Sequence, residues 1–141
     1  MLRKARDNIA RAGLENRILL VCADAKNLPF RDGTFSFGYT HSMIHHLTEP
    51  LPAIRELVRV IARGSGFMVR DLRRPPGFLL GLYVRVFGCL YTPVMKRIYR
   101  ESLQAGYTGT EMKRFCDGLE SVPCRPRSFF VTHVGIEGTK K

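Results

Sequence analysis

Apolar residues recur along this chain with two different periods, and the change of period predicts alternating helices and strands. Residues 2–12 carry leucine, alanine and isoleucine at helical spacing, and Gly13 ends the pattern. Short apolar runs at 18–23, 35–40 and 67–71 have the length and composition of strands. The first of these runs is continuous, which is typical of a strand buried in a parallel sheet.

A second helix is predicted between the last two strands. Its apolar positions share one face, two prolines stand near its start and a glycine ends it: Ile54, Leu57, Val58 and Ile61, Pro50 and Pro52, and Gly64. Because helix alternates with strand, we expect an α/β fold with a mostly parallel sheet. No linker or repeat divides residues 1–141, so a single domain is predicted.

The last third of the chain is less regular. Thr108 and Glu111 have the spacing of a capping box, which predicts a helix that ends at Gly118. Two closing strands are expected at 122–125 and 129–136, around a turn at Pro126.

The longest apolar run spans residues 78–95 and is interrupted by Arg85. It is a poor candidate for a membrane span, because glycines and a proline punctuate it. We expect a buried helix or a lid over a hydrophobic pocket, with interfacial membrane binding as the alternative.

Composition adds two expectations. The net charge of +11 favours anionic partners, but the basic residues are dispersed, so a solubilising surface is favoured over a nucleic-acid groove. The cysteines Cys22, Cys89, Cys116 and Cys124 show no paired spacing. Together with the lack of an apolar leader after Met1, this predicts reduced thiols in a cytoplasmic protein and argues against a zinc site.

Asp24 and Ala25 directly follow the first apolar run. Ligands of open α/β sheets bind at the carboxyl ends of the strands, where a carboxylate and a neighbouring backbone can recognise the amino group and ring edge of an adenine. Alone, Asp24 is equally typical of a turn. The Leu28-Pro29-Phe30 sequence and the strand after it favour the binding role.

Taken in order, these segments resemble a known family. Asp24-Ala25, Phe35 to Leu47, Glu56 to Val60, Asp71 to Pro75 and Glu101 to Thr108 resemble the middle and end of class I S-adenosylmethionine-dependent methyltransferases of the small-molecule type. One departure is Ser36, where the family usually has an aspartate. The resemblance implies S-adenosylmethionine as the cofactor and a small-molecule methyl acceptor.

The resemblance also implies roles for individual residues. Thr40 and His41 would lie near the cofactor with Asp24 and Ala25, and His45 near the substrate. His46 is the candidate for positioning the substrate or removing its proton. Arg73 would meet an anionic part of the substrate, with a solvated loop as the alternative.

The histidines permit a different chemistry as well. His41 and His45 are spaced as zinc ligands on a helix often are, and Glu49 follows them. No cysteine lies nearby and the surrounding sequence is similar to a family without a metal, so no metal site is predicted.

The resemblance implies that the chain begins in the helix after the family's second strand. A glycine-rich cofactor loop would lie before Met1, and the only dense glycine cluster, Gly64-Ser65-Gly66, precedes a strand and is expected to form a turn. The predicted fold is therefore an incomplete, N-terminally truncated Rossmann-like methyltransferase sheet, mostly parallel, without its first two strands and with an antiparallel C-terminal strand. The gap predicts one of two repairs: strand 18–23 pairs with strand 35–40, or a second copy of the chain closes the open edge.

Three functions follow from these patterns. The first is S-adenosylmethionine-dependent methyl transfer to a small-molecule acceptor. The second is a non-catalytic, dimeric remnant of a methyltransferase. The third is a basic, RNA-associated protein.

Overall fold

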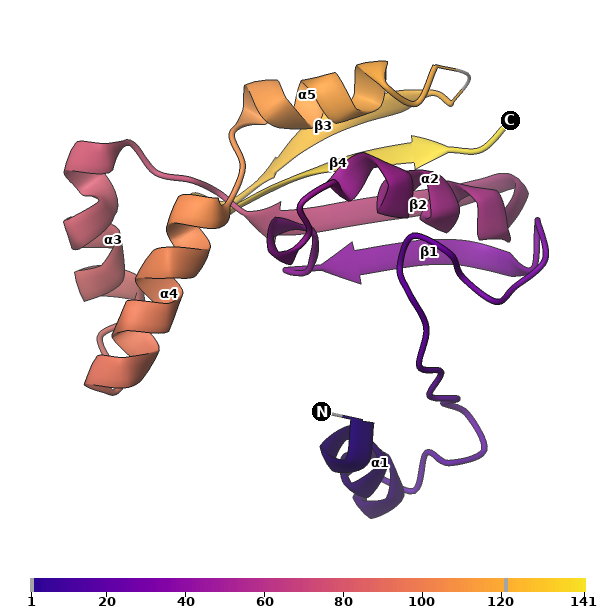
Figure 1. Cartoon of the computed structure of the whole chain (residues 1–141), viewed down its shortest axis with the longest axis horizontal. Helices are drawn as coiled ribbons and strands as arrows, with labels where there is room; N and C mark the ends of the chain where they lie inside the picture. Colours follow the sequence, from indigo (N-terminus) through magenta and orange to yellow (C-terminus); the bar gives the residue numbers. More distant parts are fainter. Residues whose placement is uncertain (1, 121) are drawn as a thin grey trace.

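The computed structural model describes residues 2–120 and 122–141 and forms a mixed α/β fold (Figure 1). Its elements, in chain order, are α1 (Leu2–Arg11), β1 (Phe35–His41), η1 (Ile44–His46), α2 (Pro50–Val60), β2 (Ile61–Leu72), η2 (Gly77–Leu79), α3 (Leu80–Phe87), α4 (Pro93–Ala105), α5 (Gly109–Asp117), β3 (Cys124–Phe129) and β4 (His133–Thr139).

The four strands form one sheet in the order β1-β2-β4-β3. β1 pairs with β2 in parallel, and β4 runs antiparallel to both β2 and β3. The α/β class and the antiparallel C-terminal strand are confirmed, but only one of the three strand pairings is parallel, because β4 lies between β2 and β3 and opposes both. The parallel register sets His41 opposite Arg70, so the carboxyl ends of β1 and β2 lie side by side.

The core lies on one face of this sheet, under α2 and α5 (Figure 1). Ile54 and Val58 of α2 and Met112 of α5 pack in one cluster with Phe67 and Val69 of β2. These strand residues alternate with ones that point to the other face, as the strand period requires. On β1 that other face carries Phe37 and Tyr39, which are exposed.

The local signals for α5 are confirmed, whereas α2 ends at Val60, before the predicted end at Gly64, and Ile61 begins β2. The Thr108 side chain accepts from the Glu111 amide, and the Glu111 carboxylate accepts from the Thr108 amide, so α5 begins with a complete capping box. Gly118 ends this helix as predicted. Gly64 has a φ of +76°, which is the left-handed turn expected of a glycine there.

The predicted strand at 18–23 is wrong. These residues form no strand, and Ile18, Leu19 and Val21 are exposed. A buried parallel strand needs a neighbour to satisfy its backbone and helices to cover it, and this segment pairs with no described strand. The first predicted repair therefore does not occur, and β1 stays at the edge of the sheet. α1 stands away from the sheet and buries none of its residues (Figure 1).

The 78–95 run is not a buried helix. It forms η2, α3 and the start of α4, a helical hairpin that projects beyond the ends of the strands (Figure 1). Of α3 only Val84 is buried. Gly88 and Pro93 bracket the bend between α3 and α4, because neither residue continues a helix well. None of the helices in the described residues is long and apolar enough to cross a bilayer.

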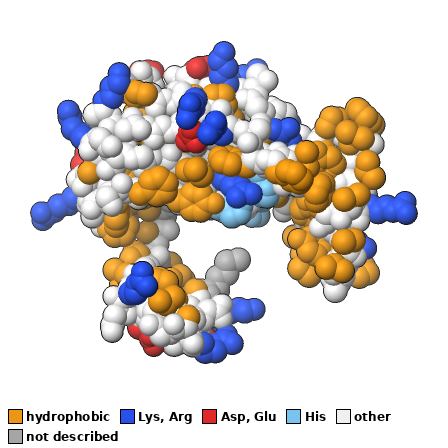
Figure 2. Space-filling model, turned by 180° about the vertical axis from the view of Figure 1, so that it is seen from behind, with side chains coloured by type: hydrophobic (Ala, Val, Ile, Leu, Met, Phe, Trp, Pro, Cys, Tyr) orange, Lys and Arg blue, Asp and Glu red, His pale blue; other side chains and the backbone are white. Residues whose placement is uncertain are grey.

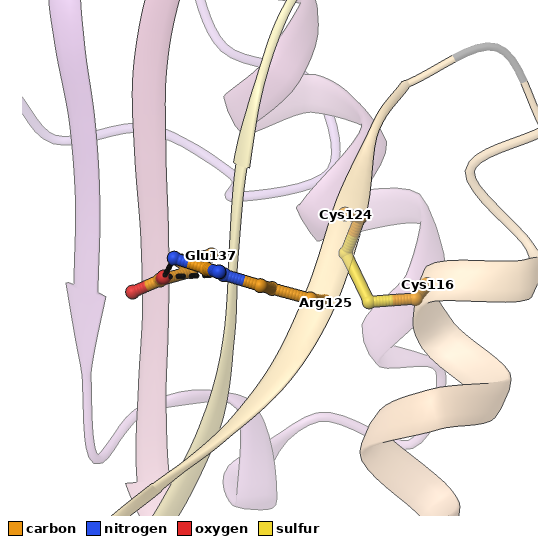
Figure 3. The surroundings of a disulfide bond; sticks show 4 residues. All are labelled: Cys116, Cys124, Arg125 and Glu137. Atoms are coloured by element: carbon orange, nitrogen blue, oxygen red, sulfur yellow. Dashed lines mark hydrogen bonds and ion pairs between the residues drawn. A yellow bond between two sulfur atoms is a disulfide. The ribbon is translucent and has the colours of Figure 1, made fainter.

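Two expectations about the C-terminal third are corrected. Pro126 lies within β3, and the turn falls later, between β3 and β4. A proline is tolerated there because β3 is an edge strand. Cys116 and Cys124 form a disulfide that joins α5 to β3, so these two are not reduced thiols, whereas Cys22 and Cys89 are free (Figure 3). Beside the disulfide, Arg125 of β3 pairs with Glu137 of β4 (Figure 3).

Candidate functional site

The segment that carries Asp24 and Ala25 is fastened to α2 by an ion-pair network. The Arg59 guanidinium donates to the carbonyl oxygens of Leu28 (3.0 Å) and Phe30 (2.8 Å). It also pairs with Asp32 and with Glu56, whose carboxylate accepts from the Leu28 amide at 2.9 Å. These bonds from Arg59 and Leu28 lower the pKa of Glu56 to about 2. α2 therefore fixes the loop that leads into β1.

A small cavity of about 180 Å³ lies where this loop meets the end of β1. Ala25 and Thr40 both line it, together with Leu28, Tyr39, Met43, Ile44, Ala53, Ile54 and Leu57. The structure thus brings together two of the four predicted cofactor residues. The lining is mostly apolar, and Ala53 and Ile54 belong to the buried core.

The other two predicted cofactor residues lie outside this cavity. Asp24 is exposed, and one of its carboxylate oxygens accepts from the Lys26 amide at 2.9 Å. This is the turn geometry that was the alternative interpretation, and it leaves the second oxygen available. His41 lies on the opposite face of β1 from Thr40, with its ring 6.1 Å from that of Tyr39 and 5.2 Å from that of His133.

A buried histidine–aspartate pair lies at the carboxyl ends of β1 and β2. His45 Nδ1 is 2.6 Å from Asp71 Oδ1, and the two side chains are 3% and 0% exposed. Asp71 also accepts from the backbone amides of His45 (3.2 Å) and Leu72 (2.6 Å). Because the carboxylate only accepts, His45 donates through Nδ1, and Nε2 of the neutral ring is left as an acceptor.

Nε2 of His45 is buried and has no hydrogen-bond partner. Such orphaned atoms are rare in folded proteins and mark sites where a ligand or water completes the bonding. The His46 ring packs against His45 with centroids 4.0 Å apart, and His46 itself is exposed. Asp71 is the functional candidate that the sequence analysis left without a role; its position at the end of an apolar strand was the available signal.

A large cavity of about 580 Å³ opens beside this pair. One wall is formed by Ser42, His45, His46, Leu72, Thr132 and His133, and the other by the α3–α4 hairpin through Phe87, Tyr91, Met95, Ile98, Tyr99 and Ser102. Burial, followed by the charges of Arg70 and His41, lowers the pKa of His133. The arrangement places three histidines in a cavity whose other lining residues are largely apolar and aromatic.

Arg73 does not line either cavity. Its guanidinium donates to Ser128 Oγ at 2.6 Å, which holds it against β3.

Tyr107 has a positioning role that the sequence did not indicate: its hydroxyl donates to the Ile44 carbonyl at 3.1 Å and so fixes the η1 turn that carries both histidines. Burial raises the pKa of Tyr107. Over residues 2–120 and 122–141, no group of three or more His, Cys, Asp or Glu side chains is placed to hold a metal ion.

The residues present fit the adenine end of S-adenosylmethionine. A flat heteroaromatic ring matches the small, mostly apolar cavity between Ala25 and Thr40, and Asp24, which precedes Ala25 in the sequence, has one carboxylate oxygen available for an amino group. In the described parts of the chain, Gly64 and Gly66 lie within β2, so they do not form a phosphate- or carboxylate-binding turn after a strand.

Comparison with known proteins agrees with this geometry. The sequence model described as "Methyltransferase domain" matches residues 1–69. Demethylmenaquinone methyltransferase of Desulfitobacterium hafniense is 31% identical over 107 residues, covering 74% of this chain and 42% of that protein. Norajmaline N-methyltransferase of Rauvolfia serpentina is 39% identical over 67 residues, covering 47% of this chain and 23% of that protein.

The fold is shared with solved methyltransferase structures. A SAM-dependent methyltransferase from Aquifex aeolicus superposes with a TM-score of 0.68 and 17% identity, covering 97% of this chain and 62% of that one. The chain spans less than half the length of the curated relatives that it matches. The order of the motifs, the matching family model and the shared fold together support a class I S-adenosylmethionine-dependent methyltransferase.

Proposed function

We propose that this chain carries the acceptor side and the adenine-binding side of a methyltransferase acting on a small molecule. The single observation that supports this most is the buried His45–Asp71 pair: Nε2 of His45 has no hydrogen-bond partner, and His45 lines a large, partly aromatic cavity. The relatives named for demethylmenaquinone and norajmaline support a small-molecule acceptor.

The proposed roles follow from where each group lies. Ala25, Thr40 and Asp24 hold the adenine end of the cofactor, which supplies an electrophilic methyl group when it is bound. Asp71 holds the His45 ring in one tautomer, and Nε2 takes the proton of the acceptor's hydroxyl or amine as that group becomes methylated. The hairpin residues exclude water from the large cavity.

This assignment moves the proton-accepting role from His46 to its neighbour. His46 is exposed and has no carboxylate partner among the described residues, so it is better suited to contacting the acceptor. His41 and Arg73 are proposed for no direct role, because neither lines a cavity with the other candidates.

Calorimetric titration of the chain with S-adenosylmethionine tests the cofactor part. We expect binding that weakens in Asp24→Ala and in Thr40→Leu, and that is unchanged in the matched surface variant Asp7→Ala. Binding that is absent from the folded chain, or indifferent to both site variants, would contradict it.

Release of S-adenosylhomocysteine with a panel of phenols, hydroquinones and amines tests the catalytic part. His45→Gln is expected to lower the rate by about 10²–10⁴-fold, as is usual for loss of a general base. His46→Gln is the matched control and should retain most of the rate. A large loss in His46→Gln with little loss in His45→Gln would return the role to His46, and equal losses would contradict the assignment to His45.

A second candidate is a dimeric remnant without catalysis. The observation that favours it is the open edge of β1, which carries the exposed side chains of Phe37 and Tyr39 on its uncovered face. Light scattering tests it: a dimer that dissociates in Ser36→Pro, a substitution that blocks edge pairing, would support this candidate. The RNA-associated alternative and the cytoplasmic location both stay predictions from the sequence.

A further inference from the structure

The α3–α4 hairpin exposes a row of large apolar side chains to solvent. Phe78, Leu82, Val86 and Leu90 follow one another at intervals of four residues and are 86%, 55%, 53% and 94% exposed. Leu82 and Val86 lie on α3, where this spacing gathers side chains on one side of the helix, and Phe78 and Leu90 lie just before and just after it. Figure 2 shows hydrophobic side chains gathered over the projecting hairpin. Exposed apolar patches of this kind mark binding surfaces.

Basic residues flank the apolar row. Arg85 lies on α3, and Lys96, Arg97 and Arg100 lie on α4, whereas Glu101 is the only acidic residue between 77 and 105. None of these four cations forms an ion pair with another described residue. Apolar side chains beside unpaired cations are the combination by which interfacial helices bind anionic lipid.

The opposite side of the same hairpin lines the large cavity. Phe87, Tyr91 and Met95 face the wall that carries His45, and Tyr91 and Met95 remain 38% and 51% exposed. Phe87 and Tyr91 directly follow Val86 and Leu90 in the sequence, so the cavity lining adjoins the outer row on the hairpin.

We propose that the hairpin docks on the surface of an anionic lipid bilayer and that the large cavity takes its methyl acceptor from that bilayer. The second half of this statement rests on the proposed function and makes the acceptor a lipid-soluble molecule. The hairpin lies on the membrane and does not span it, in keeping with its short helices. A bilayer fits better than a second copy of the chain, because a net charge of +11 opposes self-association and favours an anionic surface.

Co-sedimentation of the whole chain with vesicles tests the docking. Vesicles of phosphatidylcholine with 30% phosphatidylglycerol are compared with pure phosphatidylcholine in low and high salt. We expect binding to the anionic vesicles that weakens with salt. Phe78→Glu and Leu90→Glu should each lower partitioning about tenfold, since each removes one buried apolar side chain from the interface. Both positions are too exposed for these changes to disturb folding.

Leu19→Glu is the matched control, because Leu19 is equally exposed, at 85%, on the segment before β1. It should partition like the unaltered chain. Equal loss in all three variants, or no binding to anionic vesicles, overturns the proposal. A dimer that dissociates in Phe78→Glu, without vesicle binding, also overturns it and assigns the row to a second copy.

The docking and the proposed function can fail separately. Vesicle binding needs neither cofactor nor turnover, so binding that persists in a chain unable to bind S-adenosylmethionine upholds the docking and removes only the enzymatic role. If turnover occurs with water-soluble acceptors and is unchanged by anionic vesicles carrying an apolar hydroquinone, the acceptor part is wrong.

Discussion

The two cavities on either side of the η1 turn differ in how firmly their walls are packed and in the titratable residues that they contain. The small cavity is walled by core residues of α2 and by a loop that Arg59 ties down, and it holds no titratable chemistry beyond Tyr39. The large cavity contains the histidines and is closed on one side only by an exposed hairpin. In the proposed function, adenine is recognised by the rigidly packed cavity, and the proton is taken up in the cavity whose hairpin wall can admit a variable molecule.

The backbone reason for this division lies in the parallel pair β1–β2. Their carboxyl ends lie side by side, and the chain leaves β1 through η1, so that Ile44 points into the core while His45 meets Asp71. Neighbouring residues of one short turn therefore serve different cavities. Four ways of disturbing one cavity and sparing the other follow, from the largest effect to the smallest.

Asp71→Ala should cause the largest loss and should affect the large cavity. It removes a fully buried carboxylate and leaves the His45 ring and two amides without their acceptor. Breaking a buried pair of this kind costs about 3–5 kcal/mol of the free energy of unfolding. Urea denaturation measures it. Asp32→Ala, which removes an exposed carboxylate, is the control and should change stability by less than about 1 kcal/mol.

Ala53→Leu should close the small cavity and leave the large one intact. Ala53 is 5% exposed and lines only the small cavity, so a larger side chain occupies the space assigned to adenine. We expect S-adenosylmethionine affinity to fall by at least about tenfold, with a smaller loss of stability from overpacking. Titration calorimetry and thermal unfolding measure the two effects. Unchanged affinity would place the adenine elsewhere.

Glu56→Gln should loosen the loop beside the small cavity. The change weakens the bond to the Leu28 amide and the pair with Arg59, so amide exchange at residues 28–30 is expected to quicken by about tenfold. The pKa of Glu56 is about 2 in the folded chain against an ordinary 4.5, so its contribution is complete above pH 4.5 and is lost as the pH falls towards 2. In Glu56→Gln this acid dependence should disappear, whereas exchange in α5 should stay the same.

The smallest effect is expected from the titration of His133, which should make the free energy of unfolding depend on pH near neutrality. Burial and the charges of Arg70 and His41 lower its pKa below 6.5, so the unfolded chain binds a proton that the folded chain does not. Stability is then expected to fall as the pH drops through 6.5 and to level off below the folded-state pKa. Chemical denaturation between pH 7.5 and 5 measures it. His133→Gln should flatten the slope, and an unaltered slope would assign it to another group.

The sequence anticipated the elements whose signals are local. The capping box of α5, the apolar face of α2 and the positive φ of Gly64 depend on residues within one or two turns of each other, and all three are observed, although Gly64 lies within β2. Ala25 and Thr40, which the resemblance placed near the cofactor, line the same cavity. The apolar run at 18–23 was misread, because a continuous apolar stretch becomes a strand only where another strand pairs with it.

The histidine that carries the proposed chemistry shows the same limit. His45 and His46 are adjacent in sequence and chemically identical, and nothing local separates a catalytic ring from an exposed one. Only the parallel pairing of β1 and β2 brings Asp71, 26 residues away, to one of them.

The sequence by itself therefore indicated the family and determined the α/β class and both ends of α5, since these rest on the order of motifs, periodicity and capping. The tertiary structure decided which apolar segments are buried, which cysteines are joined, and which histidine meets a carboxylate. Those outcomes depend on contacts between residues far apart in the chain, and such contacts form only when strand register and packing place them together.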